Sequence, residues 1–186
     1  MADQNFLNHL NRIRKTYRPN RRLKITPVVL AEMEFNLKEI GRHLLSGDGE
    51  RAVMDCLDYL CRRSLDLLQH PDYNLLFEEI ISLHCRKNAG YAGIGANDPW
   101  ANFRMAQWFN VTAFTGCMVR MTDKFIRVIN LTKNPNADQV GEAITDTLQD
   151  FAVYCMIAMC LWQEEITAIL CDAGRGYEAG YQRYNM

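Results

Sequence analysis

The 186-residue sequence lacks the paired cysteines, clustered histidines and glycine-lysine loop that mark many metal and nucleotide sites. None of its seven cysteines forms a CxxC pair, which argues against a thiolate metal site and favours buried free thiols in a reducing compartment. The four histidines show neither HxH nor HExxH spacing. GxSxG is absent, and no lysine follows the glycines of "GYAGIG". Zinc-protease, serine-hydrolase and Walker-type chemistry therefore have no support in the sequence.

Long apolar runs and a strong net charge are also missing. The longest run, "FAVYCMIAMCLW" at residues 151–162, is shorter than the roughly 20 residues that span a bilayer, so it predicts a core helix. The start "MADQNFLNHLNRIRK" has no apolar segment of a signal peptide. A net charge of -1 argues against nucleic-acid binding by the whole surface. We expect a cytoplasmic protein (in the host cytoplasm if phage-encoded) that does not bind membranes, and nucleic acid is not the expected partner.

Apolar residues at spacings of three and four predict helices, and neither strand alternation nor an internal repeat is visible. Thr26 and Pro27 form a helix-start signal that opens a pair of helices within residues 26–73. Further helices are expected at about 74–88, 115–131 and 139–171, within a core of residues 74–172. The sequence thus predicts an all-α bundle of about five main helices. A basic arm, residues 1–25, precedes it and is expected to be solvated, and a flexible tail, residues 173–186, follows it.

Two charged stripes lie on the last two predicted helices. Like charges four residues apart repel, so the acidic stripe needs cations nearby. Asp150 directly precedes the most apolar run, where a carboxylate needs a metal or a basic partner. Two interpretations stay open: interhelical salt bridges, or carboxylates that hold Mg²⁺ (Mn²⁺ is the alternative) while cations hold phosphates. The acidic stripe is Glu142, Asp146 and Asp150, and the basic stripe is Arg120, Lys124 and Arg127.

The stretch "CRKNAGYAGIGANDPWANFR", residues 85–104, is long and glycine-rich for a connection between helices. Lys87 and Arg104 bracket it as cations, and its glycines permit a close approach of the backbone to a ligand. Tyr91 and Trp100 are candidates to stack on a base, with pinning of the loop to the core as the alternative. The stretch is therefore predicted to form the wall of a phosphate and base pocket.

Four segments in order, "LFEEIISLHCRKNAGYAG", "DPWANFR", "VRMTDKFIRVINL" and "EAITDTLQDFAVYCMIAM", resemble the nucleotide modification associated domain 1 family of bacteriophages. That family is related to the all-α nucleotide pyrophosphohydrolases of the MazG and dimeric dUTPase type, and the resemblance covers about residues 74–165. It implies a MazG-like helical fold in which acids from two helices bind Mg²⁺ and water attacks to release pyrophosphate. It also suggests a homo-oligomer, a dimer or larger.

Carried onto this sequence, the resemblance assigns roles to individual residues. Glu79 is the first-helix metal ligand, and Glu78 activates or orients water beside it as the second catalytic acid. The second-helix metal ligands are Glu142, Asp146 and Asp150. The implied substrate-binding residues, together with the stacking candidate Trp100, are Lys87, Tyr91, Asn102, Arg104, Arg120, Lys124, Arg127 and Tyr154.

Three departures from the family pattern bear on catalysis. Ser82 stands where the third glutamate of EExxE belongs, Glu142 and Asp146 are spaced ExxxD rather than ExxD, and Gly90 replaces the usual aspartate. The leading hypothesis is a Mg²⁺-dependent (deoxy)nucleoside triphosphate pyrophosphohydrolase of phage nucleotide metabolism that releases a nucleoside monophosphate and pyrophosphate. The alternative, which the departures favour, is a non-catalytic protein that sequesters a nucleotide or a nucleotide signal. A third reading, a nucleic-acid accessory protein, uses the basic residues between Arg12 and Lys24.

Overall fold

The computed structural model describes residues 3–47, 49–91, 98–134 and 143–184, with side chains up to Cys171. These residues form helices and no strand, which confirms the all-α prediction. The described residues contain seven α-helices rather than about five, because a helix at the N-terminus and a single turn after Trp100 were not expected. The helices are α1 Gln4–Thr16, α2 Pro27–Ser46, α3 Glu50–Leu68, α4 Tyr73–Tyr91, α5 Ala101–Arg104, α6 Ala113–Lys133 and α7 Ile144–Tyr184, with the 3-10 helix η1 at Met105–Phe109.

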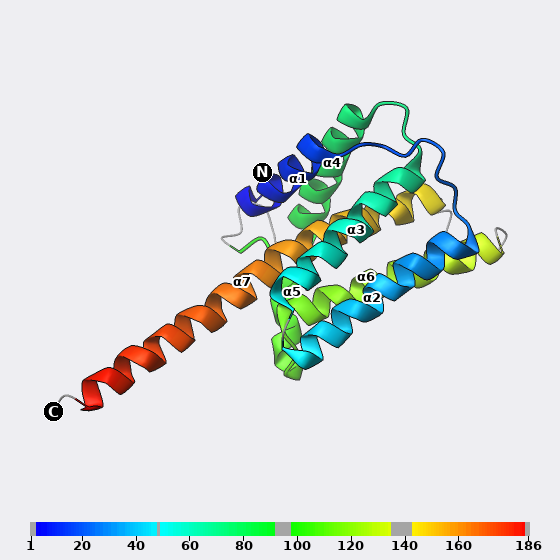
Figure 1. Ribbon diagram of the computed structural model, residues 1–186. Coiled ribbons are helices and arrows are strands. Elements are labelled where there is room, and N and C mark those ends of the chain that lie inside the picture. Colours follow the sequence, from blue (N-terminus) through cyan, green and yellow to red (C-terminus); the bar gives the residue numbers. More distant parts are fainter. Residues whose placement is uncertain (1–2, 48, 92–97, 135–142, 185–186) are drawn as a thin grey trace.

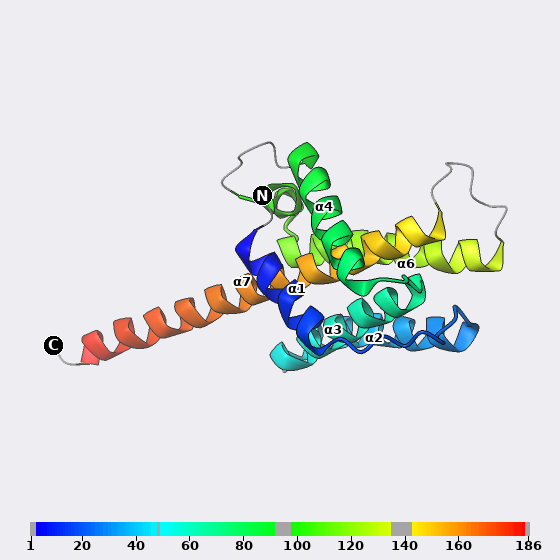
Figure 2. The same cartoon turned by 90° about the horizontal axis from the view of Figure 1, so that it is seen from above.

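Four of these helices form a bundle of two antiparallel pairs (Figure 1). α2 packs against α3, α3 packs against α7, and α7 packs against α6. The predicted helical pair at 26–73 and the predicted core at 74–172 therefore share one hydrophobic core. α1 and α4 lie across one side of this bundle, and both contact α7 (Figure 2).

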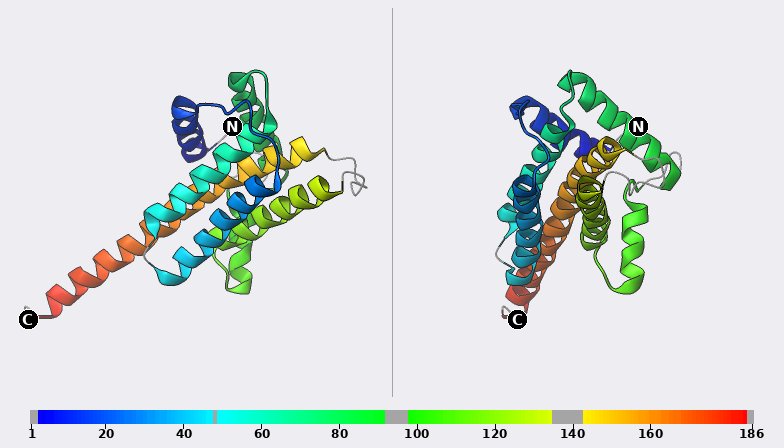
Figure 3. Two further views of the ribbon diagram at one scale, coloured as in Figure 1. Left: turned by 45° about the vertical axis from the view of Figure 1, so that its right-hand side comes forward. Right: turned by 90° about the vertical axis from the view of Figure 1, so that its right-hand side faces the viewer.

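α7 is the central helix of the bundle. From Phe151 to Trp162 every residue is buried except Tyr154, which is half-buried. A helix that is apolar on all sides must be covered on all sides, and α1, α3, α4 and α6 all contact α7. The helix continues to Tyr184, where a flexible tail was predicted, and its C-terminal part extends away from the bundle (Figure 3).

Within the described ranges, α7 is also the one helix long and apolar enough to cross a membrane by length and composition. The stretch concerned is Ile144–Cys171, and half of its most apolar window is buried inside the protein. This burial is the pattern of a core helix.

Local signals set the helix ends where the sequence places them. The hydroxyl of Thr26 accepts a hydrogen bond from the Val29 amide, 3.3 Å away, and Pro27 opens α2. Gly47 ends α2 with a φ of 69°, a left-handed conformation that favours glycine. Thr112 caps α6 in the same way as Thr26 caps α2, through the amide of Thr115 at 3.1 Å.

The prediction of a solvated N-terminal arm is wrong for residues 4–16, which form α1. Phe6, Leu10 and Ile13 recur at spacings of four and three and are fully buried, so they form an apolar stripe. The basic residues of the segment lie on the other faces of α1. Asp3 starts the helix by accepting hydrogen bonds from the amides of Asn5 and Phe6 at 2.8 and 3.2 Å.

His84 joins α4 to α1 through a stacked ring contact. Its imidazole lies parallel to the ring of Phe6, with 3.9 Å between centroids, and 5.7 Å from the ring of Trp100. Burial lowers the pKa of His84 from its ordinary value of 6.5 to about 4. The side chain is thus neutral near pH 7 and packs within the core.

This buried histidine predicts a loss of stability in acid. A group whose pKa is lower in the folded protein binds its proton more tightly when unfolded, so stability falls as pH drops below 6.5 toward 4. We expect His84 to account for about 2 kcal/mol of the decrease in unfolding free energy between pH 7.5 and pH 5. Urea titrations of His84→Phe should show a decrease smaller by this amount.

His70→Gln, which alters a half-buried histidine elsewhere on the surface, is the control and should leave the decrease in place. Equal decreases in wild type and His84→Phe would contradict the account.

Candidate functional site

A buried carboxylate with two ammonium partners marks the candidate site. Asp150 of α7 is 3% exposed and contacts the Nζ of Lys87, from the end of α4. The Nζ of Lys124, from the middle of α6, lies 2.8 Å from its Oδ2. The position of Asp150 explains this arrangement, because it stands at the border of the fully buried part of α7 and requires basic partners there.

A small pocket opens beside this cluster, between the end of α4, α5 and α7. Its volume is about 30 Å³, enough for one water-sized group and far below the few hundred Å³ that hold a small-molecule ligand. Six of the predicted site residues line this pocket. They are Lys87, Tyr91, Trp100, Asn102, Asp150 and Tyr154.

Four lining residues were not predicted: Asn88, Phe103, Val153 and Ile157. Asn88 directly follows Lys87 on α4. Its place next to a residue that is predicted to bind phosphate is the one sequence signal that could have identified it. The other three are apolar, and only the fold shows which of the many apolar side chains face a pocket. The Oδ1 of Asn102 is buried and lacks a hydrogen-bond partner within the described ranges. This oxygen is therefore available to a donor group in the pocket.

The three predicted aromatic residues have different surroundings. Trp100 is buried, and its Nε1 donates a hydrogen bond to Oε1 of Glu164 at 3.1 Å, so it pins its segment to the core. Tyr154 is half-buried, packs edge-on against Phe103, and has a raised pKa because of burial. Tyr91 is 59% exposed at the end of α4. It is the one of the three with a ring open to a ligand.

Arg104 does not join Lys87 as predicted. Its Nε donates to Asp98 and its Nη2 donates to Glu164, both at 2.7 Å. Glu164 lies 14 residues after Asp150 on α7, which is about 21 Å along a helix. Arg104 therefore belongs to an ion-pair network that fixes α5 to α7.

The basic stripe of α6 follows one face of that helix, as predicted. Lys124 pairs with Asp150, and the Nε of Arg127 donates to the Oγ1 of Thr147 at 3.2 Å. Arg120 is exposed near Tyr154, where its positive charge opposes the rise of the tyrosine pKa. Two cations of the stripe thus flank Lys124 along the same face.

The predicted metal ligands do not form one set. Glu78 pairs with Arg14 at 2.8 Å and Glu79 lies 3.7 Å from His70, both on the α4 turns before Lys87. Asp146 accepts a hydrogen bond from the Ala143 amide at 3.2 Å, which is the reciprocal half of a capping box at the start of α7. Glu142 lies outside the described residues. Where the chain is described, no three His, Cys, Asp or Glu side chains gather in a way that would hold a metal ion.

Among the described residues, the predicted ligands Glu79, Asp146 and Asp150 therefore do not gather around one position. Lys87 is eight residues beyond Glu79, about 12 Å along α4, so Glu79 is remote from Asp150. Asp150 is already compensated by two ammonium groups. At Asp150 the structure agrees with the first of the two interpretations of the charged stripes, in which acidic and basic side chains form salt bridges between helices.

The pairing of Asp150 predicts a large difference between two aspartates one turn apart. Asp150→Asn removes the buried carboxylate that two partly exposed lysines share, and we expect the free energy of unfolding to fall by about 2 kcal/mol. The control Asp146→Asn removes an exposed capping carboxylate and should cost less than about 1 kcal/mol. Urea denaturation of both variants measures the difference, and equal small losses would contradict a stabilising role for Asp150.

Comparisons of the chain with protein-family models, with curated proteins and with solved structures found no match. The resemblance to the nucleotide modification associated family therefore rests on the four sequence segments alone. No family is assigned to the chain on this basis.

Proposed function

We propose that the protein binds the phosphate groups of a nucleotide, or of a nucleotide-derived ligand, at Lys87 and Lys124 without hydrolysing them. The observation that carries this proposal is the pairing of two lysines from different helices with one buried carboxylate. The two ammonium groups and the one carboxylate of this trio together carry a formal charge of +1. Arg120 and Arg127 add to it along the same face of α6.

The cations of this site remain accessible to a ligand. The side chain of Lys87 is 42% exposed and that of Lys124 is 24% exposed, although both contact Asp150. Half-desolvated ammonium groups interact with phosphate more strongly than fully solvated ones, because the local dielectric is lower. Asp150 holds both groups in place before the ligand arrives, which reduces the entropy lost on binding.

One neighbouring feature favours a nucleotide over a simple anion. Tyr91 offers an exposed ring one turn after Lys87, where it can stack on a base. Asn102 presents a buried oxygen without a described partner inside the water-sized pocket, where a water can donate to it. Because the pocket beside Asp150 admits one water-sized group, we expect the polyphosphate to lie outside it, along Lys124 and Arg120.

Binding without turnover accounts best for the dispersed acids. Hydrolysis by the mechanism that the resemblance implies needs acids of α4 and α7 around one ion, and Glu78 and Glu79 have other partners. A Mg²⁺-dependent pyrophosphohydrolase is the second candidate function. The observation in its favour is that Asp150, a predicted metal ligand, and Lys87, a predicted phosphate-binding residue, line the same pocket.

Calorimetric titration with pyrophosphate and with the four deoxynucleoside triphosphates tests the proposal, with and without Mg²⁺. Lys87→Gln and Lys124→Gln should each weaken binding at least about tenfold, since each removes a charge-assisted contact. Lys133→Gln, which removes the same charge from the exposed end of α6, is the matched control and should change affinity less than about twofold.

Mass spectrometry of the same mixtures separates the two candidates. Intact triphosphate after prolonged incubation is the expected result. Release of pyrophosphate in the presence of Mg²⁺ would favour the hydrolase, and binding that is unchanged in both lysine variants would contradict the site itself.

A further inference from the structure

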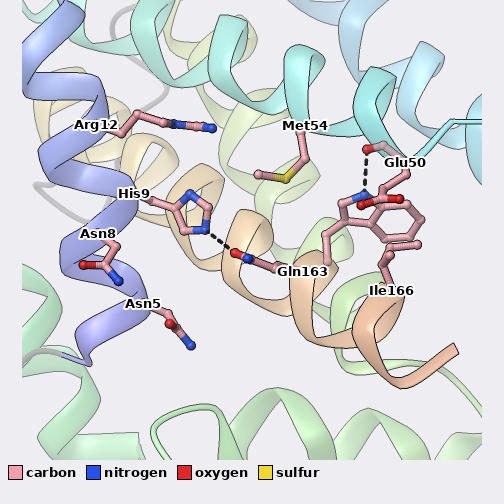
Figure 4. A pocket seen from close by; sticks show the side chains of 9 residues that line it. Asn5, Asn8, His9, Arg12, Glu50, Met54, Gln163 and Ile166 are labelled. Carbon is pink, nitrogen blue, oxygen red and sulfur yellow. Dashed lines mark hydrogen bonds between the residues drawn. The ribbon is translucent and has the colours of Figure 1, made fainter. Parts of the chain in front are cut away.

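A second and larger pocket lies where α1 crosses the start of α3 and the middle of α7 (Figure 4). Its volume is about 360 Å³, within the range of pockets that hold small organic molecules. Gln163 in its wall is 13 residues beyond Asp150, about 20 Å along α7, so this pocket is separate from the lysine site. The lining residues are Asn5, Asn8, His9, Arg12, Glu50, Met54, Trp162, Gln163 and Ile166.

One face of α1 supplies the polar side of this pocket. Asn5, Asn8, His9 and Arg12 follow one another at helical spacing, and His9 and Arg12 point toward α7 and α3 (Figure 4). The helix that was expected to be a solvated arm therefore forms one wall of this pocket.

Arg12 gives this side of the pocket a positive charge. Its Nη2 is 3.7 Å from Oδ1 of Asp58, whereas the Nε of Arg62 lies 2.5 Å from Oδ2 of the same carboxylate. Two guanidinium groups thus share one carboxylate, which leaves one positive charge uncompensated. The side chain of Arg12 is 51% exposed, and its Nη2 also contacts the Sδ of Met159 at 3.9 Å. The guanidinium is therefore held in place with capacity for an anion.

His9 lies next to Arg12 and is almost fully buried. Its Nε2 donates a hydrogen bond to Oε1 of Gln163 at 3.2 Å (Figure 4), which leaves Nδ1 as an acceptor. Burial and the charge of Arg12 lower the pKa of His9, so the ring is neutral near pH 7. Arg12 is consequently the one cation among the side chains that line the pocket.

The other side of the pocket is lined mainly by apolar side chains. Trp162 donates a hydrogen bond from Nε1 to the backbone oxygen of Glu50 at 3.0 Å, which fixes its ring beside Met54 and Ile166. Glu50, exposed at this end, brings a negative charge away from Arg12 (Figure 4). A flat or short-chain apolar group fits the Trp162 side, while a second anionic group there meets repulsion.

We propose that this pocket binds a small amphipathic carboxylate, with its anionic group at Arg12 and its apolar body against Met54, Trp162 and Ile166. One uncompensated positive charge matches one carboxylate. A triphosphate, with several negative charges, is matched instead by the two lysines at Asp150 and by Arg120 and Arg127 on the same face of α6. The two sites therefore take ligands of different charge.

The test uses 3-phenylpropionate as the probe and the indole N–H signals of the three tryptophans as the readout in two-dimensional NMR. The signals are assigned with tryptophan-to-phenylalanine variants. Titration to about 10 mM should shift the Trp162 signal in a saturable way and leave the signal of the exposed Trp108 unchanged. The neutral analogue 3-phenylpropionamide should bind at least about tenfold more weakly, since it lacks the charge that Arg12 recognises.

Matched variants locate the contact. Arg12→Gln should weaken 3-phenylpropionate binding at least about tenfold, and Lys15→Gln, which removes an exposed charge from the same helix, should change it less than about twofold. Far-UV circular dichroism verifies that both variants fold. A probe with a second carboxylate at the para position of the ring should bind more weakly than 3-phenylpropionate because of Glu50.

Three results would overturn the proposal: no selective shift of the Trp162 signal, equal affinity for the acid and the amide, or full affinity in Arg12→Gln. None of them bears on pyrophosphate binding at Lys87 and Lys124, so the failure of either proposal leaves the other standing.

Discussion

The need to cover the apolar stretch of α7 on every side governs the architecture of this protein. Residues 151–162 are buried almost without interruption, and no single neighbouring helix covers a cylinder that is apolar all round. α3 and α6 cover two sides, and α1 and α4 contact α7 from a third. α1 is thus part of the core, although its composition is basic.

Both candidate sites lie at the ends of this buried stretch. Asp150 stands just before it and draws Lys87 and Lys124 inward from two helices. Gln163 and Glu164 stand just after it, where Gln163 holds His9 and Glu164 holds Trp100 and Arg104. Polar groups at the borders of an apolar helix must find partners. These partners are polar and charged side chains of α1, α4 and α6, which therefore lie at the two ends of the buried stretch of α7.

The sequence predicted the helical class and most helix positions because apolar spacing and caps are local signals. It also predicted that Asp150 needs a metal or a basic partner, since its place before an apolar run is visible in one dimension. It did not predict which acids meet. Glu78 and Glu79 find Arg14 and His70 through packing of α4, and packing of separate helices is not encoded in spacing. The α1 pocket was missed for the same reason, because its walls come from three helices that are distant in sequence.

The central claim is that phosphate binds at the two lysines that hold Asp150. A crystal structure of the protein grown with pyrophosphate tests it most directly. The account predicts electron density for the anion within hydrogen-bonding distance of the Nζ atoms of Lys87 and Lys124, with Asp150 still between them. Pyrophosphate bound elsewhere, with both lysines engaged by Asp150 alone, would contradict it.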